Sequence, residues 1–223
     1  MSSKAQAPEI PPGEQTIGQL VADALRFYGS HFWASLVLGI GPAILTVTAA
    51  TAPRDVQIAV LLVGWPVLMT TAYVVACFLV LEQPFSSSRL AKAGLIGFAI
   101  ALPVPLLVAF FILPAVLWLA LAGLAVPVAI VEGTEFRESV RRGFALGRAD
   151  YIHAAGTLAT LVLLVALTQL ALFQLLHGLS QNAVVVAAFL ASVVVSPLLF
   201  IGSAFLYSDQ RARAEGEVES SKT

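Results

Sequence analysis

The stretch VPVAIVEGTEFRESVRRGFALGRADYIH, residues 126–153, decides the fold of this chain. An apolar run ends at Val131, an acid and a glycine follow, and four arginines then occur within twelve residues. At Tyr151 the chain becomes apolar again. This pattern is typical of a chain that leaves a bilayer, lies on its surface and re-enters it, because charged side chains are costly inside lipid.

The composition of the whole chain also favours a membrane protein. The 223 residues are 59% hydrophobic and 11% charged, whereas a soluble domain carries about 25% charged residues. So few charges cannot cover a water-facing globule, and lipid is therefore the expected solvent. The basic residues lie at segment ends rather than in one patch, which argues against nucleic acid as a partner.

The reactive residue types offer little chemistry. The single cysteine, Cys77, lies in an apolar run, so no disulfide can form within the chain. The histidines His31, His153 and His177 are far apart and lie near segment ends, which favours polar tips at the interface over metal ligands. The sequence contains no phosphate-binding glycine loop, catalytic triad or zinc motif. We therefore expect no cofactor, no metal and no enzyme activity.

Apolar segments of membrane-spanning length predict an all-α, polytopic integral membrane protein with six transmembrane helices. About 20 apolar residues are needed to cross a hydrocarbon core of about 30 Å. Two further segments have one apolar and one charged face, which is typical of amphipathic helices in the membrane interface. In this single membrane domain, 16–207, the spans are expected at 32–51, 58–81, 93–111, 114–131, 151–177 and 183–207, with interfacial helices at 16–29 and 134–148. Beyond it we expect a disordered tail over 1–15 and a charged cytoplasmic tail over 208–223.

The uncharged run 93–131 is too long for one span. As a single helix its 39 residues would extend about 58 Å at 1.5 Å per residue. Its prolines would also interrupt such a helix. Two spans with a tight turn fit better, and the turn is expected either near Pro103–Pro105 or near Leu113–Pro114.

The distribution of positive charge predicts the orientation. With six spans, eleven of the twelve Lys and Arg residues fall on one side, and only Arg54 falls on the other. The positive-inside rule places the eleven in the cytoplasm. We therefore expect a multi-pass protein of the cell inner (plasma) membrane with both termini cytoplasmic. The eleven are Lys4, Arg26, Arg89, Lys92, Arg137, Arg141, Arg142, Arg148, Arg211, Arg213 and Lys222.

The arginine-rich helix has three interpretations. In the first, its arginines hold the loop against anionic headgroups. In the second, Glu132 and Asp150 at the membrane boundaries pair with arginines in a structural network. In the third, the guanidinium groups bind a phosphate-bearing ligand or lipid headgroup. The candidate residues are Glu132, Arg137, Arg141, Arg142, Arg148, Asp150, Asp209, Arg211 and Arg213.

Two local patterns describe the face of this helix. Phe136, Val140 and Phe144 recur at four-residue spacing and form an apolar stripe, with Gly143 and Gly147 beside it. Glu138 is positioned to pair with Arg142 at the i,i+4 spacing.

Polar residues inside the spans are the other candidates. Buried glutamine amides seek partners on neighbouring helices, whereas Ser and Thr can bond to their own helix backbone. Interhelical hydrogen bonding is the favoured role and a substrate pathway the alternative. The candidates are Thr70, Thr168, Gln169 and Gln174.

The chain resembles the membrane domain of glycerophosphoryl diester phosphodiesterases and related uncharacterised bacterial six-helix membrane proteins. The similarity lies in Pro127-Val-Ala-Ile-Val-Glu132-Gly133, in Ser139-Val-Arg141-Arg142 and in the ending Tyr207-Ser-Asp209-Gln-Arg211-Ala-Arg213. Gly143 and Ser208 depart from the family pattern, which usually has serine and a second tyrosine there. The resemblance implies fold and location, and it implies no catalysis.

These observations favour a non-catalytic inner-membrane protein that organises or supports membrane processes. Its expected partners are the lipid bilayer, anionic lipids and another membrane protein. One alternative is a permease-like transporter for a small amphiphile or lipid, which a polar cavity converging on Thr70, Thr168 and Gln169 would favour. The other is a membrane regulatory subunit of a separately encoded enzyme.

Overall fold

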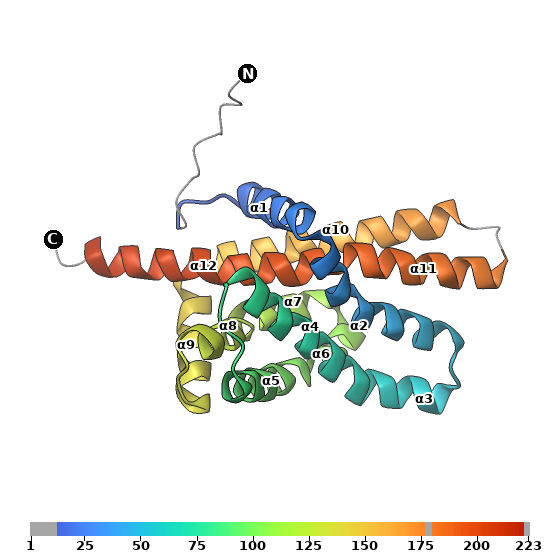
Figure 1. Ribbon diagram of the computed structural model, residues 1–223, viewed down its shortest axis with the longest axis horizontal. Coiled ribbons are helices and arrows are strands. Elements are labelled where there is room, and N and C mark those ends of the chain that lie inside the picture. Colours follow the sequence, from blue (N-terminus) through green and yellow to red (C-terminus); the bar gives the residue numbers. More distant parts are fainter. Residues whose placement is uncertain (1–12, 177–179, 221–223) are drawn as a thin grey trace, which may run out of the picture.

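The computed structural model describes residues 13–176 and 180–220, and within these ranges its regular elements are all helices (Figure 1). They are α1 (Ile17–Ser30), α2 (Phe32–Thr51), α3 (Arg54–Ala59), the π-helical turn η1 (Val60–Gly64), α4 (Trp65–Val80), α5 (Ser87–Ala101), α6 (Val104–Phe110), α7 (Ile112–Ala122), α8 (Ala125–Val131), α9 (Phe136–Ala149), α10 (Tyr151–Leu175), α11 (Gln181–Val195) and α12 (Pro197–Ser220).

Six helical segments in the described residues are long and apolar enough to cross a membrane. The prediction of an all-α chain with six such helices is therefore confirmed. Several of the segments are joined from two or three of the elements above, such as α3, η1 and α4. The six are Phe32–Thr51, Arg54–Val80, Ser87–Phe110, Ile112–Val131, Tyr151–Leu172 and Asn182–Gly216.

Several helices extend beyond the apolar residues that predicted them. The second of the six segments starts at Arg54 rather than at residue 58. Asp55 lies in its first turn, where the helix dipole favours an acid. The third starts at Ser87 rather than at residue 93. Helix α12 continues to Ser220, through the stretch expected as a charged tail. Ion pairs at the i,i+4 spacing, Asp209–Arg213 and Arg211–Glu215, stabilise this polar extension.

The turn between the third and fourth segments lies at Phe111. Its extended backbone, with φ −160° and ψ 152°, separates α6 from α7. Pro114 then falls in the first turn of α7, where proline is tolerated. At Pro103 the chain breaks between α5 and α6 without reversing, and the indole of Trp118 donates a 2.8 Å hydrogen bond to the nearby Ile100 carbonyl. The reversal is therefore near the second of the two expected positions.

The two segments predicted as interfacial helices take different positions around the bundle. Helix α9 lies across one end of the molecule, at a steep angle to α12, and the last turns of α12 extend past the same end (Figure 1). Helix α1 instead runs beside α12. Its Phe27 ring meets Phe205 edge to face, and the Tyr28 hydroxyl donates to the Val194 carbonyl at 2.8 Å. Burial raises the pKa of that tyrosine.

Small residues allow the helices to approach closely, as is common in membrane bundles. A Cβ at Gly39 on α2 would overlap the backbone of Val193 on α11. A Cβ at Gly202 on α12 would lie 2.6 Å from the Leu161 side chain on α10. These contacts bring α2 against α11, which is far from it in sequence, and α10 against α12.

Candidate functional site

The buried face of α9 is formed by small residues. Ser139, Gly143 and Gly147 recur at four-residue spacing and are all buried. A Cβ at Gly143 would overlap the backbone of Ala125, and one at Gly147 would lie 2.6 Å from the Leu121 carbonyl oxygen. The glycines therefore let α9 lie directly against the junction of α7 and α8.

The apolar stripe that the sequence indicates lies to the side of this glycine face. Val140 and Phe144 pack against the core, and the Phe144 ring meets Trp118 edge to face at 6.0 Å between centroids. Phe136 is exposed. The stripe thus contributes two of its three members to the packing.

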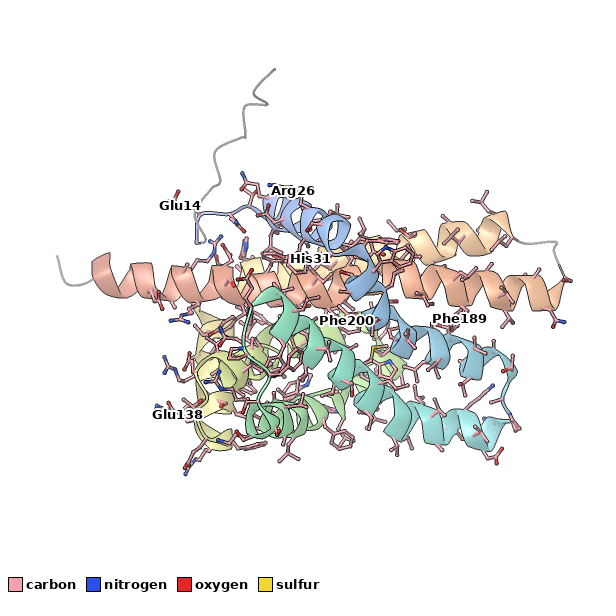
Figure 2. All side chains as sticks on the ribbon, viewed as in Figure 1. Glu14, Arg26, His31, Glu138, Phe189 and Phe200 are labelled. Carbon is pink, nitrogen blue, oxygen red and sulfur yellow. The ribbon has the colours of Figure 1, made fainter. Side chains whose placement is uncertain are left out.

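The opposite face of α9 presents its arginines outward. Side chains of Arg141 and Arg142 are 76% and 53% exposed. Arg137 and Arg148 are exposed as well, and the described part of the chain provides no ion pair for either. Figure 2 shows Glu138 on this outer side of α9, at the end of the molecule.

The two central arginines take different acidic partners. Arg141 makes a two-pronged pair with Glu138, at 2.9 and 2.8 Å, and this hydrogen bonding lowers the pKa of Glu138. Arg142 lies 2.8 Å from Glu132. The predicted pair between Glu138 and Arg142 is wrong, because the i,i+3 geometry brings Arg141 to Glu138 and leaves Arg142 facing the end of α8.

Glu132 and Gly133 form the connection from α8 to α9. Gly133 adopts φ +65°, a left-handed conformation that costs other residues steric strain. Beside it, the Arg89 guanidinium on α5 donates to the Ile130 carbonyl at 3.2 Å. This contact satisfies a carbonyl at the carboxyl end of α8, where helix carbonyls lack internal partners.

A second polar cluster joins α12 to the start of α10. Asp209 is 1% exposed and accepts from Arg213 at 2.8 Å. The same guanidinium lies 3.1 Å from Asp150. His153 Nε2 lies 3.1 Å from Asp209, so this ring contacts the cluster. Arg211 lies outside the cluster and pairs with Glu215 at the surface.

The chain's amino-terminal segment closes this second cluster. The amide of Gly13 donates to Asp209 at 2.9 Å, and Arg213 donates to the Gln15 carbonyl at 2.7 Å. Residues 13–15 were expected within a disordered tail, but Gly13 and Gln15 contact α12. The rest of that tail, including Lys4, and Lys222 at the other end lie outside the described residues.

The sequence missed His153, Gln210 and Gly13 as members of this cluster. Gln210 is fully buried and donates to the Asp150 carbonyl at 3.2 Å. Its place among Asp209, Arg211 and Arg213 is a signal that this part of α12 is polar. For Gly13 the sequence contains no such signal, because its amide is its only contribution.

The polar residues inside the spans do not converge. Gln169 donates to Ser192 at 3.2 Å, and Ser192 lies 3.1 Å from Thr46, which links α10, α11 and α2. Thr168 donates to the Leu164 carbonyl of its own helix. Gln174 is exposed on α10, whereas Thr70 is buried on α4.

The candidate residues thus form charge networks at one end of the molecule and hydrogen bonds between helices inside it. Within residues 13–176 and 180–220, the acids, histidines and cysteine form no group of three or more suited to a metal ion. The fold and the site together define an all-helical chain with six potential membrane spans and a charged end. No protein-family model, curated protein or solved structure matches this chain.

Proposed function

We propose that this protein is a non-catalytic, six-span membrane protein that binds anionic lipids at its cytoplasmic face and supports membrane processes there. The observation that carries the proposal is the position of α9. Its glycine face is buried against α7 and α8, so the helix is held in place, and its arginines face outward. Guanidinium groups suit lipid phosphates because they offer two parallel donors.

Two of the four arginines on α9 are free to bind such headgroups. Arg141 and Arg142 are occupied by Glu138 and Glu132. Arg137 and Arg148 lie near the two ends of the helix, exposed and without an acidic partner in the described residues. Each arginine near an anionic surface contributes about 1 kcal/mol of attraction.

We propose that the protein spans an inner (plasma) membrane of the bacterial type and that both of its termini lie in the cytoplasm. In Figure 1, α9, the start of α1 and the end of α12 lie toward one end of the molecule, whereas Arg54 begins α3 toward the opposite end. In the sequence, the three connections on this opposite side contain no Lys or Arg besides Arg54. This asymmetry supports the orientation by the positive-inside rule.

We also propose a relationship to the membrane domain of the glycerophosphoryl diester phosphodiesterase group. Its support is the set of motif residues quoted above, several of which contact one another here. Glu132 pairs with Arg142, and Asp209 pairs with Arg213. A shared motif that forms one charged end of the bundle is consistent with common architecture.

Neither alternative function gains a specific supporting contact. A permease with a polar pathway was expected to bring Thr70, Thr168 and Gln169 into one cavity, and these three side chains have separate surroundings. A regulatory subunit requires a partner surface that no described feature singles out.

Native mass spectrometry of the gently extracted protein tests the lipid proposal. The wild type should retain phosphatidylglycerol in preference to phosphatidylcholine. The double variant Arg137→Gln/Arg148→Gln should lower that preference roughly fivefold per arginine. Arg54→Gln, which removes the lone cation at the opposite end, is the matched control and should leave the preference intact. Equal retention of the two lipids by the wild type would refute the proposal.

A further inference from the structure

The turn between the third and fourth apolar segments, residues 110–113, has apolar side chains throughout. These side chains are between 55% and 78% exposed, and they are Phe110, Phe111, Ile112 and Leu113. The connection from α2 to α3 instead contains the charged residues Arg54 and Asp55, and Ser180 caps α11. Polar side chains are usual where a turn meets water, so the turn at 110–113 differs from these two connections.

Helix α7 is too short to carry this turn far from the charged end of the molecule, where α9 lies. A Cβ at Gly147 on α9 would lie 2.6 Å from the Leu121 carbonyl oxygen. The Tyr151 hydroxyl, at the start of α10, donates to the Leu117 carbonyl at 3.3 Å. The nine residues from Leu121 back to Ile112 correspond to about 14 Å of helix. This length is roughly half of the hydrocarbon core of a bilayer.

Helix α8, the second part of the fourth segment, adds no reach, because both of its ends are held at the charged end. A Cβ at Gly143 on α9 would overlap the backbone of Ala125, where α8 begins. Arg89, in the first turn of α5, donates to the Ile130 carbonyl near the other end of α8. The fourth segment therefore has enough residues to cross a membrane but does not extend along one straight axis.

The third segment reaches the same limited height. The indole of Trp118, in the middle of α7, donates to the Ile100 carbonyl at 2.8 Å, which places the break between α5 and α6 beside α7. Beyond this break α6 has seven residues, or about 10 Å of helix, before the turn. The two arms of the hairpin thus agree on where it ends.

The neighbouring helices continue past this point with little cover. Helix α10 starts at the charged end, and its 25 residues extend about 37 Å. Ala154, Leu158 and Leu161 in its first half are 0–7% exposed. Leucines farther along are 54–79% exposed, and they are Leu163, Leu167, Leu170 and Leu175. Every residue of α3 and η1 is also at least partly exposed. In Figure 1, α6 lies near the middle of the long axis, whereas α3 and α11 reach toward the far end.

We propose that α5, α6, α7 and α8 form a hairpin that enters the bilayer from the cytoplasmic side and ends inside it, with the turn at 110–113 in contact with lipid acyl chains. Lipids of the outer leaflet then fill the space between this turn and the outer surface. The inference rests on the membrane placement proposed above and gives two of the six segments a shorter reach. Both termini remain cytoplasmic, because a hairpin that enters and leaves on one side reverses the chain as two crossings do.

The chemistry of the turn favours hydrocarbon over water as its surroundings. In water its four neighbouring side chains would expose a continuous apolar patch, which is unfavourable. Backbone groups must be satisfied within the protein when a turn lies in lipid. The Phe111 amide donates to the Leu107 carbonyl at 3.0 Å, and Pro114 has no amide hydrogen to satisfy.

The depth of a nitroxide spin label in proteoliposomes tests the proposal. Single cysteines at positions 111, 55 and 180, in a Cys77→Ala background, would carry the label. Oxygen concentrates in hydrocarbon, whereas a neutral nickel chelate stays in water, and both change the saturation of the label. The label at 111 should be accessible to oxygen and protected from nickel, and the labels at 55 and 180 should show the reverse. Nickel access at 111 as high as at 55 and 180 would overturn the proposal.

A label at Ile40, an exposed residue in the middle of α2, distinguishes the hairpin from the membrane placement on which it rests. Protection from nickel at 40 together with access at 111 would refute only the hairpin. Access to nickel at both positions would refute the membrane placement and the hairpin with it.

Substitution of the turn provides a second, independent measurement. Phe111→Arg puts a charge where the proposal places hydrocarbon, and it should lower the amount of protein recovered in membranes several-fold. Phe111→Leu keeps the position apolar and should leave recovery unchanged. Val56→Arg, near the outer connection between α2 and α3, is the matched control and should be tolerated because its side chain can reach water. Equal recovery of Phe111→Arg and Val56→Arg would contradict the assignment.

Discussion

The Nε atom of Arg213 lies 2.8 Å from Oδ2 of Asp209, one turn earlier on α12. The same guanidinium also reaches Asp150, which begins α10, and the backbone of Gln15 before α1. One arginine thereby connects three parts of the chain that are far apart in sequence. Because Asp209 is almost fully buried, this pair differs from the surface pairs on α9.

Replacing Arg213 with alanine is expected to destabilise the protein by about 3 kcal/mol, because it leaves a buried carboxylate without its cation. Unfolding in detergent, followed by circular dichroism, measures the change. Arg211→Ala is the control, since its partner Glu215 is largely exposed, and it should cost less than about 1 kcal/mol.

The double variant Asp209→Asn/Arg213→Ala should recover part of the stability that Arg213→Ala loses, because it removes the buried charge as well. If Arg213→Ala lowers the free energy of unfolding no more than Arg211→Ala does, the buried pair is unimportant for stability.

Replacing Gly143 with valine should separate α9 from the bundle. The added side chain would meet the Ala125 backbone, which cannot rotate away as a side chain can. Overpacking of this kind typically costs about 1–3 kcal/mol. The matched control is Ala145→Val on the exposed side of α9, and the melting temperatures of the two variants provide the measurement. Equal melting temperatures would contradict the close packing described here.

The Glu138–Arg141 pair predicts a pH effect that is confined to acid conditions. Hydrogen bonding from Arg141 lowers the pKa of Glu138 below its usual 4.5. The contribution of the pair to stability is therefore present above pH 4.5 and is lost as the pH falls through the lowered value. Carbon-13 NMR of the labelled carboxyl group measures the midpoint.

Arg141→Gln should raise the Glu138 midpoint, whereas Arg148→Gln, farther along α9, should leave it where it is. High salt should weaken the effect, because the pair is exposed. An unchanged midpoint in Arg141→Gln would mean that Arg141 is not the cause of the shift.

Hydropathy predicts which segments form the six long helices, because each segment must be apolar along its whole length. It does not predict where these helices end. Ser87 and Arg54 begin helices outside the apolar runs, and α12 continues to Ser220 on the strength of polar side-chain pairs. Pattern in a single sequence locates such ends poorly, because they depend on local hydrogen bonds.

The candidate site could be predicted only in part. Acids at the two ends of the 132–150 connection, with arginines nearby and in the tail, predict ion pairs, and the structure contains Glu132–Arg142 and Asp150–Arg213. In the structure Glu138 pairs with Arg141 and not with Arg142. This choice depends on side-chain rotamers, which a sequence pattern does not predict. Thr70 is buried and Thr71 is exposed, and this difference is likewise invisible in sequence, because it depends on which way each faces inside the bundle.

The central claim, a six-span protein with both ends in the cytoplasm, is tested most directly by cysteine labelling in intact cells. In a Cys77→Ala background, single cysteines would replace Ser88, Glu135 and Glu215 on the proposed inner side and Asp55 and Ser180 on the outer side. A membrane-impermeant maleimide should label only the cysteines at 55 and 180, and the other three only after the cells are opened. Labelling at position 135 or 215 in intact cells would contradict the account.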